Sequence, residues 1–195
     1  AEEFPLKRSS DENFVIAMLD PAPMNNTQAL AMKKTRAAEL GISTFSQLVA
    51  QASDLVLIGP SEFAEREDGL PGMKALYGDF EFAGYKAVDP GLRYPAILSD
   101  EADVVVAFGT DGEIAAYDLV GLQDDKGLYP PYQIAPVIRQ AVLDGDPGIA
   151  AALNKVAPFL TNEVMQRLNN EVSGNGREPA DVAKEFLVAQ GLISE

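Results

Sequence analysis

Unbroken apolar runs, each ended by Gly or Pro, dominate the hydrophobic pattern before residue 110. The run FVIAML ends at Asp20-Pro21, and the run VVVAF ends at Gly109. Runs without alternating polar residues are typical of strands buried on both faces of a parallel sheet. The pattern predicts such strands at residues 14–19, 55–58 and 104–108, with weaker candidates at residues 80–86 and 119–122.

Helical periodicity fills the segments between and after these runs. Phe45, Leu48 and Val49 share one helical face, and either Ser43 or Thr44 is available as the N-cap. Elsewhere a proline marks a helix start and a glycine marks a helix end. The predicted helices cover residues 45–49, 70–77, 90–99, 136–143, 147–156, 161–172 and 179–190.

Strands that alternate with helices predict an α/β layered fold. In the helix at residues 90–99, Leu92, Ala96 and Ile97 are expected to face inward. The helical tail after Tyr132 has few strands of its own, so it must cover a sheet that is not obvious in this sequence. Residues 1–13 are polar and aperiodic, and we expect them to form a loosely held leader.

Composition excludes several functional classes. The 195 residues include 30 acidic and 15 basic ones, for a net charge of −15. This balance disfavours nucleic acid and anionic lipid surfaces, and the apolar runs are too short to insert into a bilayer. With neither Cys nor His, the chain cannot form disulfides, zinc sites built from those residues, or imidazole-based catalytic centres.

We therefore expect no metal and no cofactor, and a protein that is not an enzyme. A hydrolase that uses acidic residues is a weak alternative, because no pair of carboxylates shows a reason for one pKa to rise. Glycine-rich phosphate loops are also missing from the sequence.

Two polar segments have side chains suited to ligand binding. Asn26, Thr27 and Gln28 follow a proline-rich bend and can bond a ligand at a cleft edge, although Asn and Thr also stabilise ordinary turns. Arg66 lies among three carboxylates in the sequence EREDG. Such a group is either a solvated ion cluster or a guanidinium fork held ready for a ligand carboxylate.

Two further segments are candidates for the same edge. Thr110 and Asp111 follow the strongest predicted strand, at the end where open α/β sheets bind ligands, although they also suit a turn and a helix cap. The sequence YPPY places Tyr132 on a stiff backbone, where it would face Phe108 as half of a box for a cation. A surface polyproline turn is the alternative. Residues 124–127 are interpreted as a solvated loop.

Taken in order, four segments resemble one protein family, that of the substrate-binding proteins of ABC transporters for glycine betaine, choline and related osmoprotectants. The segments are LDPAPMNNTQALAM, FAEREDGLPGMKALYG, DPGLRYPAI followed by AFGTDGEIAAYDLVGLQDDKGLYPPY, and NEVMQRLNNEVSGNGREPADVAKEFLVAQGLI. The similarity covers residues 14–193, and the first segment looks most like the osmotically inducible, low-affinity branch. The resemblance implies a type II periplasmic-binding fold that closes on its ligand like a hinged clamp.

The resemblance also implies a division of the chain. Residues 1–19 would be the leader and first crossover, residues 20–118 a complete α/β lobe (lobe two), and residues 119–195 the second crossover with a helical return to lobe one. Family members carry a further upstream βα portion of lobe one, which forms one wall of the ligand site. Residues 1–13 do not match that portion.

By position in the family's motifs, Arg66 resembles the arginine that clamps the ligand carboxylate, and Phe108 and Tyr132 resemble two aromatic residues of the cation cage. Aromatic faces attract a trimethylammonium group by roughly 0.5–2 kcal/mol per ring. Gln28 stands where cage-forming members have an aromatic residue, so weak or altered binding is expected. The remaining ligand-binding candidates are Asn26, Thr27, Thr110 and Asp111.

The implied function is capture of a quaternary-ammonium solute and its delivery to an ABC permease and its ATPase. The implied location is periplasmic or otherwise extracytoplasmic, with a lipid anchor on the full-length precursor as one arrangement. The alternative is a shortened interaction or sensory module that kept the scaffold and lost tight ligand binding.

Overall fold

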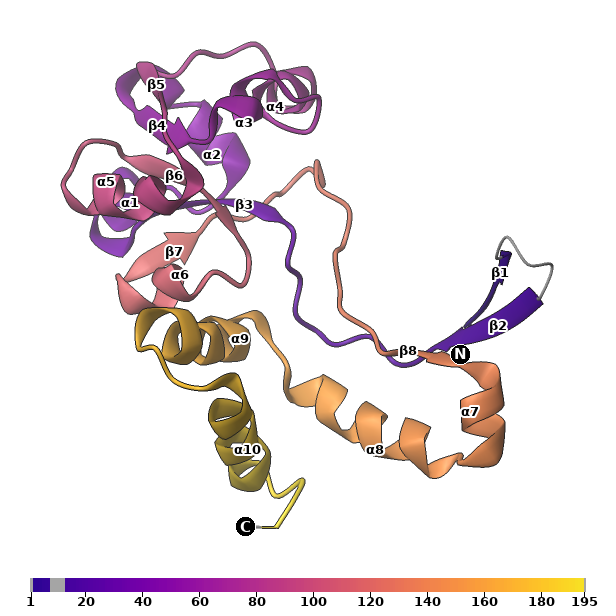
Figure 1. Ribbon diagram of the computed structural model, residues 1–195. Helices are drawn as coiled ribbons and strands as arrows, with labels where there is room; N and C mark the ends of the chain where they lie inside the picture. Colours follow the sequence, from indigo (N-terminus) through magenta and orange to yellow (C-terminus); the bar gives the residue numbers. More distant parts are fainter. Residues whose placement is uncertain (1, 8–12, 195) are drawn as a thin grey trace.

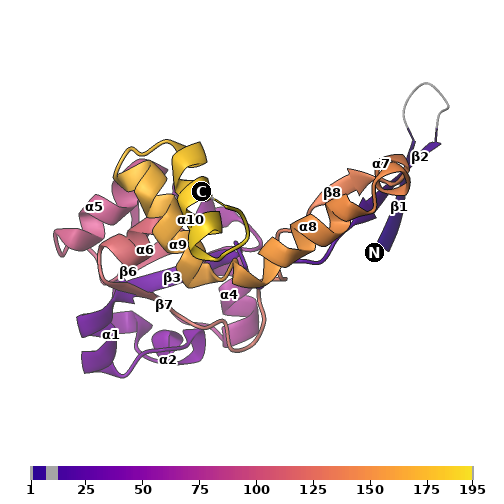
Figure 2. The same cartoon turned by 90° about the horizontal axis from the view of Figure 1, so that it is seen from below.

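Two β-sheets of different size divide the protein into a body and an arm (Figure 1). The structure is a computed structural model that describes residues 2–7 and 13–194. A five-stranded sheet forms the centre of the body, and a three-stranded sheet forms the arm. Figure 2 shows the arm extending well away from the body, joined to it by two connecting segments and by a helix.

The strand order of the body sheet is β5-β4-β6-β3-β7. Strand β4 is parallel to β5 and β6, whereas β3 is antiparallel to its neighbours β6 and β7. Because β3 runs antiparallel to β6, its first residue lies next to the last residue of β6. The strands are β3 (Gln28–Lys33), β4 (Val56–Gly59), β5 (Gly84–Ala87), β6 (Val104–Phe108) and β7 (Leu119–Gly121).

Helices cover both faces of this sheet. Strand β3 shows why: successive side chains point to opposite faces, so Leu30 joins the core that contains Phe45, and Ala31 joins the core that contains Ile97. Both faces of β6 are buried. The helices of the body are α1 (Lys34–Leu40), α2 (Phe45–Val49), α3 (Ser61–Glu65), α4 (Leu70–Tyr77), α5 (Arg93–Leu98) and α6 (Gly112–Ala116), with short 3₁₀ turns at Ala52–Asp54 and Pro90–Leu92.

The arm consists of antiparallel strands and two helices. Its sheet has the order β1-β2-β8, with β1 at Glu2–Lys7, β2 at Asn13–Met18 and β8 at Val137–Arg139. Helices α7 (Gln140–Gly145) and α8 (Gly148–Val156), and a 3₁₀ turn at Ala157–Phe159, lead back to the body.

Residues 19–27 and 122–136 connect the arm and the body, and residues 19–26 run beside residues 132–136. The backbone N–H of Leu19 donates to the carbonyl of Pro136 at 2.9 Å, and that of Ala22 to the carbonyl of Ile134 at 2.8 Å. An isolated β-bridge joins Asn25 to Gln133. The two connections therefore form a narrow hydrogen-bonded ribbon.

The end of the chain returns to the body (Figure 2). Helix α9 (Asn162–Asn169) and the π-helical turn η4 (Asn170–Gly174) pack against α6, and α10 (Pro179–Ala189) follows them. This differs from the expected return of the whole tail to lobe one, because α9 contacts the body sheet's own helix. Side-chain amides of Gln166 and Asn169 donate to the carbonyls of Gly109 and Thr110, each at 2.8 Å.

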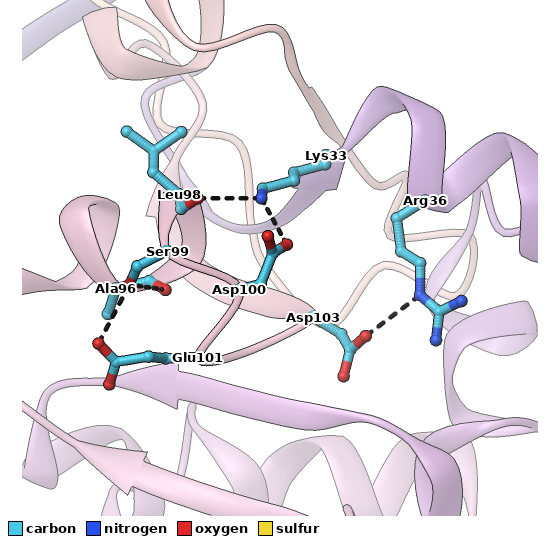
Figure 3. A network of polar contacts seen from close by, with 8 residues as sticks. All are labelled: Lys33, Arg36, Ala96, Leu98, Ser99, Asp100, Glu101 and Asp103. Atoms are coloured by element: carbon cyan, nitrogen blue, oxygen red, sulfur yellow. Dashed lines mark hydrogen bonds and ion pairs between the residues drawn. The ribbon is translucent and has the colours of Figure 1, made fainter.

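A polar network closes the opposite end of β3, as Figure 3 shows. Lys33 donates to the carbonyl of Leu98 at 3.1 Å and pairs with Asp100 at 2.6 Å. Asp103 accepts from the Nε of Arg36 at 3.2 Å and from the backbone N–H of Val56 at 3.0 Å. These contacts tie α1 and β4 to the loop before β6. They hold the last residue of β3, Lys33, whereas the first residue of β3 lies beside the end of β6.

Several predicted elements are confirmed. The strands at residues 55–58, 104–108 and 119–122 match β4, β6 and β7, and Thr44 caps α2 through a capping box with Gln47. Five predicted helices match α2, α4, α5, α8 and α10 closely. The helix predicted at residues 161–172 continues from α9 into the π-helical turn η4.

Other predictions were wrong. The strand at residues 14–19 exists as β2, but it lies in the antiparallel arm sheet, and exposure alternates at its end, with Ala17 at 0%, Met18 at 36% and Leu19 at 6%. Residues 2–7 of the expected leader form β1, while residues 1 and 8–12 lie outside the described residues. Leu92 is 56% exposed rather than inward-facing.

Two segments differ because long-range pairing overrides the local pattern. Residues 136–143 were predicted to be helical throughout, but residues 137–139 pair with β2 as β8 and only the rest is helical. Strand β3 was not predicted at all, although it lies between β6 and β7 in the sheet. Both segments take their conformation from the strands beside them.

The half-buried phenol of Tyr85 makes stability depend on pH in the alkaline range. Its hydroxyl donates to the Pro60 carbonyl at 2.5 Å, and burial, with the nearby Glu62 carboxylate, raises its pKa to about 12. Because the unfolded value is about 10, this contribution is complete below pH ~10 and is lost as the pH rises through the folded value. We expect Tyr85→Phe to lose less unfolding free energy than the wild type between pH ~9 and ~11.5 in urea titrations. Equal losses in both proteins would contradict this assignment.

Candidate functional site

One hollow gathers most of the residues predicted to bind a ligand. Its volume is about 490 Å³, and it lies where β3 begins and β6 ends, because Gln28 pairs directly with Phe108. Six of the eight candidates line it. The lining residues are Asn26, Thr27, Gln28, Arg66, Asp68, Phe108, Tyr129, Pro130 and Tyr132. Two other hollows, of about 570 and 500 Å³, lie along α10 and contain none of the candidates.

Arg66 provides the positive charge of this hollow. It follows the last residue of α3, and its Nε donates to Asp68 Oδ1 at 2.7 Å while Nη2 donates to Asp68 Oδ2. This bond holds the pKa of the Asp68 carboxyl below its usual value. Asp68 therefore bonds the side of the guanidinium that carries Nε. No hydrogen bond from Nη1 is found among the described residues, so this end is available to a second carboxylate.

Phe108 and Tyr132 provide aromatic surface in the same hollow. Phe108 is the last residue of β6, and its side chain is 38% exposed. Tyr132 lies on the second connecting segment and is 61% exposed. Exposed aromatic rings beside a guanidinium give the hollow one end that suits an anion and another that suits a methylated cation.

Thr110 and Asp111 do not line the hollow but lie behind it. Thr110 is 6% exposed, and its Oγ1 donates to Asn26 Oδ1 at 2.7 Å. Asp111 accepts from the backbone N–H of Phe108 at 2.9 Å and from Arg93 at 2.7 Å. These two residues hold Asn26 and Phe108 in place rather than facing the open volume.

Arg93 is a residue of this region that the sequence analysis did not single out. Its side chain is 11% exposed, and its guanidinium carbon lies 5.0 Å from the ring centroid of Tyr94 and 5.7 Å from that of Phe108. The Tyr94 hydroxyl also donates to Asp111, at 2.6 Å. A buried ion pair thus supports the Phe108 ring from behind.

The loop before the YPPY sequence is ordered by Asp124, which was interpreted as part of a solvated loop. Its carboxylate accepts from the Tyr77 hydroxyl and, at 2.8 Å, from the backbone N–H of Tyr129. The backbone N–H of Lys126 donates to the same Tyr77 hydroxyl at 2.9 Å. The loop is therefore tied to α4, and that interpretation was wrong for Asp124.

Sequence reasoning also missed Asp68 and Tyr129 as lining residues. Both stand in motifs that were singled out, EREDG and YPPY, so adjacency to Arg66 and Tyr132 was the available signal. Burial, with the nearby carboxylates of Asp68 and Asp124, raises the pKa of Tyr129. The hydroxyls of Tyr129 and Thr27 are buried without a hydrogen-bond partner among the described residues.

Within residues 2–7 and 13–194, no cluster of three or more acidic side chains is arranged to hold a metal ion. The same residues contain no helix with the length and apolarity needed to cross a bilayer.

Residues 5–189 match the OpuAC family, described as the substrate binding domain of ABC-type glycine betaine transport systems. This match spans nearly the whole chain. The chain belongs to this family.

Similar proteins agree with the OpuAC assignment. A glycine-betaine-binding protein of Pseudomonas aeruginosa is 33% identical over 195 residues, which cover 95% of this chain and 63% of that protein. The ergothioneine transport permease/ergothioneine binding protein EgtU of Helicobacter pylori is 33% identical over 187 residues, which cover 96% of this chain and 34% of that protein.

A crystal structure described as a glycine betaine/carnitine/choline ABC transporter superposes with a TM-score of 0.87 at 37% identity, covering 91% of this chain and 65% of that one. The predicted periplasmic-binding fold, with one complete lobe and part of another, is confirmed by this similarity. The chain spans about a third to two thirds of the length of these three proteins.

Proposed function

We propose that this OpuAC-family chain supplies the larger part of a binding site for a quaternary-ammonium solute, such as glycine betaine or choline, that an ABC importer takes up for osmoprotection. The observation that carries the proposal is the shared hollow, in which the guanidinium of Arg66 and the rings of Phe108 and Tyr132 line one volume of about 490 Å³. The proposal includes no catalytic step.

The chemistry of the solute explains these residue types. A trimethylammonium group has no N–H to donate, so aromatic faces hold it through their quadrupole, at about 0.5–2 kcal/mol per ring. A carboxylate at the other end of the solute would bond the Nη1 end of Arg66. Gln28, opposite Phe108 in the sheet register, gives that side of the cage an amide instead of a ring, which supports weak or altered binding.

The other predicted residues have supporting parts in this proposal. Asn26 and Thr27 provide polar lining, and Thr110 and Asp111 fix Asn26 and Phe108 from behind. We keep residues 20–118 as lobe two and the segments around them as crossovers. The solute would close the two lobes on itself and be handed to a permease with its ATPase, outside the cytoplasm, with a lipid anchor as one means of attachment.

Compounds named for similar proteins narrow the solute class. Glycine betaine, carnitine, choline and ergothioneine occur in those names, and all four carry a trimethylammonium group. This common group, rather than any one of the compounds, is what the two rings would recognise. No feature of the described residues favours the interaction or sensory module.

Calorimetric titration with glycine betaine, carnitine and choline tests the proposal. We expect binding of all three trimethylammonium solutes. We expect 3,3-dimethylbutanol, the uncharged carbon analogue of choline, to bind at least about tenfold more weakly than choline. Tyr132→Ala is expected to weaken choline binding about five- to tenfold, whereas Tyr117→Ala, which removes a ring 43% exposed outside the hollow, leaves it unchanged. Absence of heat with every solute would overturn solute capture and favour the module instead.

A further inference from the structure

The YPPY segment at residues 129–132 has every backbone N–H accounted for. Tyr129 donates its N–H to Asp124 Oδ2 at 2.8 Å, and Tyr132 donates its N–H to Asn25 Oδ1 at 2.6 Å. The two prolines between them have no N–H and restrict φ. The carbonyl of Tyr132 in turn accepts from the backbone N–H of Asn26 at 3.2 Å. The segment is therefore held by side-chain oxygens at both ends and stiff in the middle.

Asn25 is itself fixed by residues from two other elements. Its backbone N–H donates to Asn162 Oδ1, at the start of α9, at 2.7 Å, and its carbonyl accepts from Asn162 Nδ2 at 3.4 Å. Gly109 lies so close that a Cβ at that position would collide with the Asn25 carbonyl oxygen. Asn25 Oδ1, which accepts from the Tyr132 N–H, thus belongs to a residue whose backbone is held by other contacts.

The ring of Tyr132 lacks such support from packing. At 61% exposed, most of its surface faces water, so its position is set by the backbone that carries it. An aromatic residue that must be ordered during binding loses side-chain and loop entropy, and a backbone fixed in advance avoids that loss.

We propose that Asn25 is a positioning residue for the Tyr132 ring, with Asp124 as the second anchor of the same segment. The inference deepens the proposed function and rests on it for its effect on affinity. The anchoring itself is a property of the ligand-free chain. Asn25, which does not line the hollow, would thus determine how rigidly the exposed Tyr132 ring is held in it.

A fluorescence experiment isolates the anchoring from ligand binding. The chain contains no Trp, so Tyr132→Trp places a single indole at the position in question. In that background we expect Asn25→Ala to lower the indole anisotropy and weaken its near-UV circular dichroism. Asn25→Asp keeps an oxygen that accepts from the residue 132 N–H, and is expected to restore both signals.

Matched variants separate anchoring from general loosening. Asn154→Ala removes an amide oxygen that accepts from the backbone N–H of Asp20 at 3.2 Å on the same connecting segment, and is expected to leave both indole signals unchanged. Asp124→Ala, which removes the carboxylate that accepts from the Tyr129 N–H, is expected to lower the anisotropy by releasing the first residue of the segment. Unchanged anisotropy in both Asn25→Ala and Asp124→Ala would overturn the proposal. If Asn25→Ala fails to fold, unchanged anisotropy in a folded Asp124→Ala would overturn it.

Binding measurements give the second readout. With Tyr132 intact, Asn25→Ala is expected to raise the Kd for choline about fivefold, and Asn25→Asp is expected to return it to within about twofold of the wild-type value. If the wild type binds no quaternary ammonium, the proposed function fails while the anisotropy comparison still decides the role of Asn25. Lower anisotropy with an unchanged Kd would overturn the positioning role.

Discussion

Replacing Arg66 with alanine is expected to weaken glycine betaine binding about 50-fold and choline binding less than about twofold. The two solutes share the trimethylammonium group, but only betaine has a carboxylate for the guanidinium. Loss of a charge-assisted bidentate contact removes about 2–3 kcal/mol, which is the source of the difference. Parallel calorimetric titrations of both solutes measure it.

Arg66→Lys serves as the matched control. It retains the positive charge but not the planar fork, so its ammonium cannot hold Asp68 and a ligand carboxylate through paired parallel bonds. We expect betaine affinity between those of the wild type and Arg66→Ala. Equal weakening of betaine and choline by Arg66→Ala would contradict the assignment of this residue to the carboxylate.

The largest effect on stability is expected from Asp111→Ala, at about 3 kcal/mol of unfolding free energy. The side chains of Arg93 and Asp111 are only 11% and 19% exposed. Removal of the carboxylate leaves the Arg93 guanidinium without its anion and deprives the Tyr94 hydroxyl and the Phe108 N–H of their acceptor. A buried charge that loses its partner is costly because no opposite charge then compensates its desolvation. Urea unfolding of the two proteins gives the difference directly.

Two comparisons identify the cause. Glu81→Ala removes one member of the exposed Lys74–Glu81 pair and is expected to change stability by less than about 0.5 kcal/mol. The double variant Arg93→Met, Asp111→Leu removes both charges and is expected to recover much of the loss, since an apolar pair can replace a buried ion pair. A loss in Asp111→Ala no larger than that in Glu81→Ala would show that the pair does not stabilise the body.

Elements whose local pattern and long-range packing agree were predictable from sequence. The run at residues 104–108 is apolar throughout, and β6 is buried on both faces between β4 and β3. Thr44 was one of two candidate caps, and its capping box with Gln47 requires only nearby residues. Local rules suffice in both cases because no distant segment competes.

Strand β3 could not be predicted in this way. Its sequence QALAMK contains two alanines, which favour helices, and it follows a polar turn. It becomes a strand because β6 and β7 offer hydrogen bonds on both of its edges. The run at residues 14–19 shows the converse, since an apolar composition cannot indicate which sheet a strand joins or what covers it.

For the candidate site, the sequence indicated which residues would gather at one end of the sheet, but not the direction of each side chain. Arg66, Phe108 and Tyr132 share the hollow as the resemblance implied. Thr110 and Asp111 lie two and three residues after Phe108, yet they point behind it because Asp111 accepts from the Phe108 N–H in the turn. Such orientations depend on loop dihedral angles that residue types alone do not specify.

The ribbon formed by residues 19–26 and 132–136 has a mechanical consequence. A pair of hydrogen-bonded segments resists sliding along its length, since Leu19 and Ala22 would each lose a backbone bond, but it flexes easily across its flat face. These two segments therefore oppose sliding of the arm more than bending across the flat face of the ribbon. Asn25 lies near the body end of this ribbon, beside the bridge to Gln133, so any such bending pivots close to the backbone that carries Tyr132.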